Sequence, residues 1–114
     1  MSKLDEKVGQ YIDEVRGTLG MEPDVDLLRK VAEGLGPAIY NNDASKVAAT
    51  DPKEVETVKR NFLMKKLGLD DSDDLDQRLK SVLDMYASKS RTKYRAVVYY
   101  LLTKEFGKDS VYDT

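Results

Sequence analysis

The chain has 114 residues, the length of one ordinary domain, and its mixture of 40% hydrophobic and 35% charged residues is typical of a globular protein. Its 19 basic and 21 acidic residues give a net charge of −2, so the chain as a whole does not attract nucleic acid or an anionic membrane. Cysteine and histidine are absent, which excludes disulfides and thiolate catalysis and removes most zinc chemistry and the usual general base. We therefore expect one domain over residues 1–114, with no cofactor, and favour a non-enzymatic role.

Two features of the sequence argue against a secreted or membrane protein. The first 15 residues, "MSKLDEKVGQYIDEV", are charged throughout and lack the apolar region of a signal peptide. The longest apolar run, Ala96 to Leu102, is far shorter than the roughly 20 residues that a membrane-spanning helix needs. We expect a cytoplasmic protein without a membrane partner.

Two amphipathic helices are predicted in the first third of the chain. The first carries apolar residues at helical spacing from Leu4 to Leu19, and Gly20 follows as a stop. The second begins after Asp24, whose side chain can cap the free amides of the first turn, and it ends at Gly36.

The middle of the chain combines an irregular segment with the clearest helix signal. Residues 37–50 contain the turn-forming sequence Asn-Asn-Asp, and we expect irregular structure there with short helical pieces. Asp51 can then cap a helix whose first residue is proline, Glu54 can reach back to the cap, and Gly68 can end the helix. The sequence predicts a helix over residues 52–67 with apolar side chains on two sides.

Two more helices are predicted in the last third. The stretch "DDSDDLDQRLKSVLDMYASKS" begins with an Asp or Ser cap and carries apolar residues at helical spacing. The stretch "TKYRAVVYYLLTKEFG" holds seven consecutive apolar residues, which fit either a buried strand or a buried helix. A lone strand would leave its backbone without a sheet partner, so we expect a helix over about residues 92–106. The sequence therefore predicts a compact all-α domain of about five helices, with this last long helix at its centre.

Basic residues gather in two segments that contain no acidic residue. Either cluster could be solvated, could pair with the aspartates of residues 70–76, or could bind an external phosphate or nucleic-acid backbone. We favour the solvated or internally paired interpretation and keep the external anion as the alternative. The clusters lie at 59–66 and 89–104, and the candidate anion-binding residues are Lys59, Arg60, Lys66, Arg91, Lys93 and Arg95.

Neither of two short motifs predicts a metal or cofactor site. The run from Asp70 to Asp76 lacks the glycine and the glutamate that a calcium-binding loop needs at its sixth and twelfth positions. Aspartates at a helix start are more simply explained by the helix dipole. The sequence "GLGPAI" lacks the third glycine of a dinucleotide-binding loop, and no strand precedes it.

Two long stretches, "GLGPAIYNNDASKVAATDPKEVETVKRNFLMKKLGL" and "YRAVVYYLLTKEFGKDSVY", resemble a family of small bacterial proteins. This is the domain-of-unknown-function family number 2853, and the likeness extends from about Leu35 to Tyr112. The resemblance implies a small, soluble, helical bacterial protein. It implies no catalytic or binding residue.

The leading functional hypothesis is a non-enzymatic module that contacts another macromolecule. Its partner is an unidentified protein, and Leu63, Met64 and Leu67 are candidate contact residues if the core leaves their face uncovered. The same face would allow a weak homo-oligomer instead of a monomer. A weak anion or nucleic-acid backbone binder is the alternative, and a hydrolase or transferase built on carboxylates and tyrosines ranks last.

Overall fold

The helices begin and end at the residues that local chemistry favours. The computed structural model describes residues 2–113. Asp24 Oδ1 accepts a hydrogen bond from the Leu27 amide at 3.2 Å, and an Asp51 oxygen accepts one from the Lys53 amide at 3.0 Å, so both predicted caps are confirmed. Gly68 has a φ of +73°, the left-handed conformation predicted for a helix stop. The elements in chain order are α1 (Lys3–Asp13), η1 (Glu14–Thr18), α2 (Val25–Leu35), η2 (Gly36–Tyr40), α3 (Pro52–Thr57), η3 (Val58–Met64), α4 (Asp73–Lys89), α5 (Arg95–Glu105) and η4 (Asp109–Tyr112).

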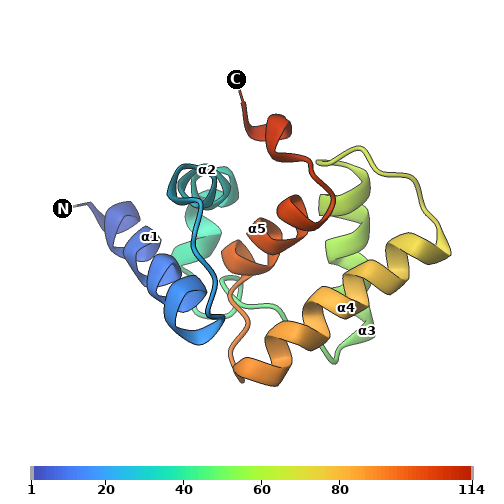
Figure 1. Ribbon diagram of the computed structural model, residues 1–114, viewed down its shortest axis with the longest axis horizontal. Coiled ribbons are helices and arrows are strands. Elements are labelled where there is room, and N and C mark those ends of the chain that lie inside the picture. Colours follow the sequence, from blue (N-terminus) through green and yellow to red (C-terminus); the bar gives the residue numbers. More distant parts are fainter. Residues whose placement is uncertain (1, 114) are drawn as a thin grey trace.

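The α5 helix lies at the centre of the molecule. Figure 1 shows it between α1 and α2 on one side and α3 and α4 on the other, and it packs directly against α2 and α4. Every residue from Ala96 to Thr103 is buried, which is why the apolar run shows no single hydrophobic face. The radius of gyration of 13.2 Å is about the value expected for a compact chain of this length. The predicted all-α domain with a central last helix is confirmed, and no helix within residues 2–113 is both long and apolar enough to span a bilayer.

The α5 helix starts three residues later than predicted because its approach is paired with another segment. The Val47 amide donates to the Lys93 carbonyl at 2.7 Å, and the Arg95 amide donates to the Ser45 carbonyl at 2.7 Å. These bonds form an isolated antiparallel bridge between Lys46 and Tyr94. The bridge holds residues 93–94 in an extended conformation, and it fixes the irregular segment before α3 against the start of α5.

The helix predicted over residues 52–67 is continuous from Pro52 to Met64, three residues short of the predicted end, and its second half widens into the π-helical segment η3. A π-helical turn holds more residues than an α-helical turn, so the 100° spacing used for prediction does not hold there. Residues expected on two different sides are consequently buried in the same core, namely Val58, Phe62, Leu63 and Leu67. The Glu54 side chain does not serve the helix cap but forms an ion pair with Arg95.

Candidate anion-binding site

The first basic cluster is divided among internal partners. Lys59 is 7% exposed, and its Nζ lies 2.6 Å from Asp71 Oδ1 and 2.8 Å from Asp76 Oδ1. The hydrogen bonds that Lys59 donates to these two carboxylates raise its pKa above the usual value. Lys59 therefore joins η3 to the start of α4 and has no free charge to offer an external anion.

Two other candidates from this cluster point to different parts of the surface. Arg60 pairs with Glu56 one turn earlier in the same helix. The Lys66 Nζ lies over the ring of Tyr112, 5.0 Å from its centroid, which is within the range of a cation–π contact. Arg60 and Lys66 therefore do not converge with Lys59 on one anion site.

The candidate protein-contact residues in and just after η3 lie in or against the core. Leu63 is fully buried and Leu67 is 3% exposed, while Met64 is partly buried and packs against the core. Their face is covered by the chain's own elements, so these side chains stabilise the fold of this chain.

Arg95, another candidate anion-binding residue, also has internal partners. Its guanidinium donates to the carbonyl oxygens of Ala44, at 2.8 Å, and Lys46, at 3.1 Å, and it pairs with Glu54. Because the arginine side chain is only 14% exposed, these contacts lie mostly out of water. Arg95 thus ties the segment before α3, and α3 itself, to the start of α5.

Arg91 and Lys93 remain, and the fold joins them to a cation that sequence reasoning missed. Both lie beside Lys46 in the wall of a cavity of about 310 Å³, called here the basic pocket. Among residues 2–113, neither Arg91 nor Lys93 has a carboxylate within 4.0 Å. Lys93 Nζ donates to the Arg91 carbonyl at 2.8 Å. The basic pocket is lined by Asn42, Asp43, Lys46, Val47, Ala48, Arg91, Thr92 and Lys93.

A second cavity, of about 190 Å³, adjoins the basic pocket and is called here the tyrosine pocket. Asn42 and Lys46 line both cavities, and Lys46 Nζ donates to Asn42 Oδ1 at 3.2 Å across their shared wall. Tyr40 is 45% exposed at this site, whereas Tyr94 accepts a hydrogen bond from Gln10 Nε2 at 2.9 Å. The tyrosine pocket is lined by Lys7, Gln10, Ile39, Tyr40, Asn41, Asn42, Ser45, Lys46 and Tyr94.

The groove between α3 and α4 is a different kind of cavity. Its volume is about 430 Å³, and its apolar lining includes Val55, Leu79 and Leu83. The charged side chains around it are already paired, as Lys80 with Asp84 at 2.6 Å illustrates. A ligand there would meet apolar walls and few polar groups free to orient it.

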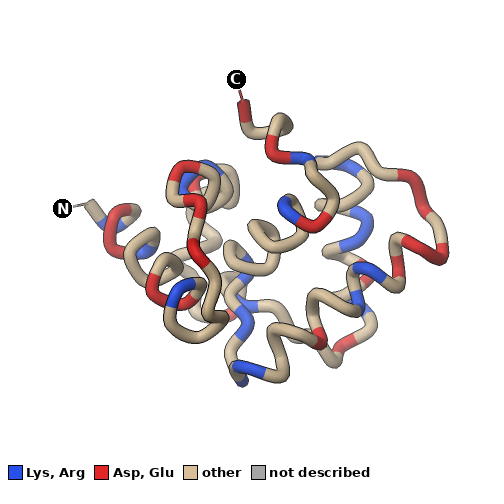
Figure 2. Tube along the Cα trace, viewed as in Figure 1, with Lys and Arg blue, Asp and Glu red and all other residues tan. Residues whose placement is uncertain are grey.

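Acidic and basic residues are separated along the molecule, which favours the basic pocket as the place where an anion would bind. Figure 2 shows acidic residues gathered over the segment that leads into α4, and basic residues gathered beyond the other end of that helix. The acidic residues of the first α4 turn complement the helix dipole, as predicted. Within residues 2–113, no group of three or more acidic side chains is placed to hold a metal ion.

The sequence contained no local signal for Lys46 as a site residue. Lys46 lies in the segment predicted to be irregular, nearly fifty positions before Lys93, and only the backbone bridge of residues 45–47 to 93–95 brings the two together. The sequence did indicate the segregated charge of the second cluster. Helical periodicity could not show that residues 45–47 pair with the backbone of this cluster.

Comparison with known proteins places this site within a described family. No curated protein matches the chain. A family model with the description "Protein of unknown function (DUF2853)" matches residues 10–110. The matched range contains α2 to α5 and every residue of the basic pocket, and it confirms the resemblance found in the sequence. The chain therefore belongs to the family described as protein of unknown function (DUF2853).

Proposed function

We propose that this chain is a non-enzymatic interaction module that binds a phosphate-bearing polymer, the backbone of a nucleic acid, through the basic pocket. The observation that carries the proposal is the convergence of Lys46, Arg91 and Lys93 around one cavity with a single carboxylate, that of Asp43. The excess of positive charge there contrasts with the net charge of −2 of the whole chain. Phosphate is the anion that such a group of lysines and arginine meets most often in macromolecules.

The division of the basic residues between two roles supports this proposal. Lys59 is buried and Arg95 is largely buried, and both are held by carboxylates, so they serve the fold. Arg91 is exposed and its guanidinium is not paired with any carboxylate of residues 2–113, although an arginine gains most from a bidentate anionic partner. The backbone that carries Arg91 and Lys93 is held to residues 45–47 by hydrogen bonds, so the pocket is preorganised.

A non-enzymatic role agrees with the chemistry available in the chain. Neither histidine nor cysteine is present, so acid–base catalysis at neutral pH would rest on carboxylates, lysines and tyrosines. Three of the four charged side chains that line the basic pocket are cations, which can position a phosphate.

The first prediction concerns the salt dependence of this binding. A fluorescence anisotropy titration with a short single-stranded oligonucleotide should detect binding at low salt. With three cations at phosphates, log K should fall against log salt with a slope of about −2, so affinity drops roughly 20-fold between about 50 and about 200 mM salt. The double variant Arg91→Ala/Lys93→Ala should bind more weakly and with a shallower slope.

The control is a variant of equal charge change outside the pocket. Lys53→Ala/Lys65→Ala removes two exposed lysines and should retain most of the affinity, because these residues lie on other surfaces. If no oligonucleotide binds at low salt, or if both double variants lose affinity equally, the proposed function is wrong.

A further inference from the structure

We propose that the polymer bound at the basic pocket is single-stranded, and that one unpaired base enters the tyrosine pocket and stacks on Tyr40. This inference rests on the proposed function, because the phosphate that follows the base would lie against Lys46, Arg91 and Lys93. It adds a class of ligand and a second set of contacts.

The two cavities are arranged like the two parts of a nucleotide. One is bordered by three cations, and the other has the two tyrosines and three amide side chains, with Lys7 also in its lining. Asn42 and Lys46 belong to both linings. A phosphate and its own base are covalently joined through the sugar, so a nucleotide site requires adjoining compartments of these two chemistries. Lys46 lies at the boundary, where its ammonium can contact a phosphate held on either side of the shared wall.

Tyr40 provides an aromatic surface that the core does not use. It lies at the end of η2 and is 45% exposed, whereas Tyr11 and Tyr86 are fully buried. Burying an exposed aromatic ring against a base is the main sequence-independent contribution to single-strand binding. Tyr94 lines the same cavity, and its ring already packs against Tyr11 with centroids 5.7 Å apart. Tyr40 is therefore the residue left to stack.

Amide side chains around the tyrosine pocket can meet the edge of a base. Asn41 Oδ1 accepts hydrogen bonds from the amides of Asp43 and Ala44, both at 2.9 Å, so its oxygen is occupied and its NH2 group is left to donate. The same holds for Asn42, whose Oδ1 accepts from Lys46. These donors fit carbonyl oxygens and ring nitrogens, which occur on the edges of the nucleobases.

The small volume of the tyrosine pocket favours a single base over a base pair. At about 190 Å³ it is smaller than the cavities of about 300–1,000 Å³ that enclose drug-sized ligands, so it suits one planar base. A base within a duplex is stacked and paired, and it would have to be extruded at a cost before it could enter. A single strand presents its bases without that cost, which predicts a preference for single strands over duplexes.

The test compares three oligomers of equal length: a single strand, the same strand with abasic sugars throughout, and the duplex. At one salt concentration, the single strand should bind about ten-fold more tightly than the abasic strand, which keeps the phosphates but has no base to stack. Tyr40→Ala should lower the affinity of the single strand to that of the abasic strand and leave the abasic strand unchanged. Tyr40→Phe, which keeps the ring, should retain most of the difference.

The possible results separate this inference from the proposed function. If the abasic strand or the duplex binds as tightly as the single strand, or if Tyr40→Ala has no effect, the inference is wrong and the basic pocket still binds phosphate. If none of the oligomers binds, both proposals fail. Because Tyr40 is exposed, its variants should fold, and an unchanged circular dichroism spectrum and Tm would verify this.

Discussion

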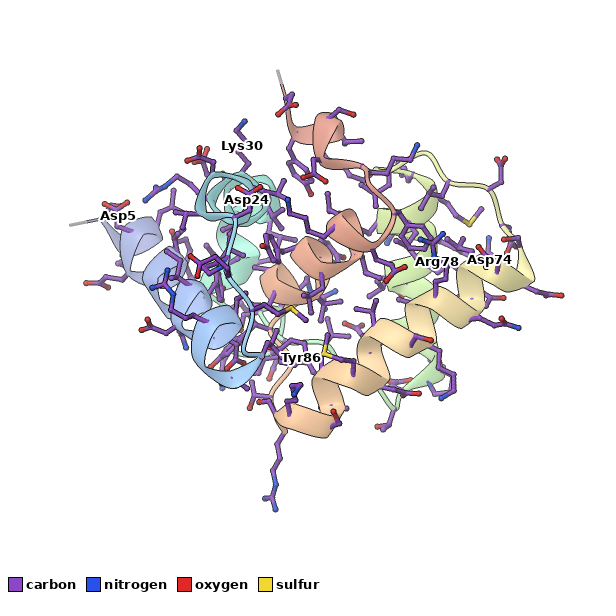
Figure 3. The ribbon with its side chains drawn as sticks, in the orientation of Figure 1. Asp5, Asp24, Lys30, Asp74, Arg78 and Tyr86 are labelled. Carbon is purple, nitrogen blue, oxygen red and sulfur yellow. The ribbon has the colours of Figure 1, made fainter. Side chains whose placement is uncertain are left out.

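Two fully buried tyrosines differ in whether their hydroxyl groups form hydrogen bonds. The Tyr86 hydroxyl donates to Glu14 Oε2 at 2.6 Å and accepts from the Tyr94 amide at 3.3 Å. Tyr86, labelled in Figure 3, lies on α4, whereas Glu14 is the first residue of η1. The Tyr11 hydroxyl, in contrast, is buried without a hydrogen-bond partner among the described residues, and burial raises its pKa to about 12. One hydroxyl joins two helices, and the other is an uncompensated polar group.

Removing these two hydroxyls should therefore change stability in different directions. Tyr86→Phe leaves the Glu14 carboxylate without its donor and should lower the free energy of unfolding by about 1–2 kcal/mol. Tyr11→Phe removes an unpaired buried hydroxyl and should leave the free energy of unfolding unchanged or raise it by up to about 1 kcal/mol. Urea denaturation of both variants would measure the difference, and equal losses would contradict this account.

The start of each helix shows how the elements are joined to one another. α1, α2, α3 and α4 each have a side-chain oxygen that accepts from a first-turn amide, whereas α5 has no side-chain cap and its Arg95 amide donates to the Ser45 carbonyl. The central helix thus begins at a tertiary contact, while the outer helices begin at local ones. The Asp24 cap is an exception, because it makes a local and a tertiary contact at once. Its second carboxylate oxygen lies 2.9 Å from Lys104 Nζ on α5.

Substitutions of Asp24 should separate its two roles. Asp24→Ala removes the cap and should cost about 1 kcal/mol, whereas Asp24→Asn keeps an oxygen for the Leu27 amide and should lose only the small contribution of an exposed ion pair. The hydrogen bond from Lys104 lowers the pKa of Asp24 below 3.8, so the ion pair stabilises the fold above that pH. Its contribution should disappear as the pH falls through the lowered pKa.

Thermal unfolding of the two variants and the unchanged protein at pH 7 and at stepwise lower pH would check both statements. The difference between the unchanged protein and Asp24→Asn should shrink on acidification, because the carboxyl becomes protonated and neutral like the amide. A difference that grows toward low pH would contradict the assigned sign.

At the scale of the whole molecule, one hydrophobic core joins all five helices. Leu102 is fully buried on the central helix, and the core cluster that contains it includes buried residues from α1, α2, α4, α5 and η3, with the partly buried Val55 of α3 packed against it. Leu102→Ala should lower the free energy of unfolding by about 2–5 kcal/mol, because the truncation leaves a cavity that the surrounding side chains fill only in part. Urea denaturation should show one transition at a lower midpoint.

Val25→Ala offers the matched control for this prediction. Val25 is 41% exposed on α2, and its truncation should change the free energy of unfolding by no more than about 0.5 kcal/mol. A loss as large as that of Leu102→Ala, or two separate transitions in either variant, would contradict a single core centred on α5.

The sequence predicted the helices well because their signals are local. The Asp24 and Asp51 caps and the stop at Gly68 act within a few residues, and each was confirmed. The apolar spacing also acts locally, and its prediction was wrong only where η3 is π-helical. Contacts that span the chain could not be predicted this way. Internal pairing with the aspartates of residues 70–76 was one of the interpretations that the sequence allowed, but periodicity did not single out Lys59 as the residue that pairs. The approach of Lys46 to Lys93 does not follow from helical periodicity at all. Whether a basic residue serves the fold or is free to bind an anion is therefore decided by its partners in three dimensions.

The position of the central helix α5 in the chain has a consequence for folding during synthesis. α5 follows the four helices that it joins, so on the ribosome their apolar faces are made before the element that covers them. A nascent chain stopped before residue 95 would lack Ala96 to Thr103, every one of which is buried in the finished protein. The early helices should then remain protease-sensitive and available to chaperones, and protection should arise late, when the central helix leaves the exit tunnel.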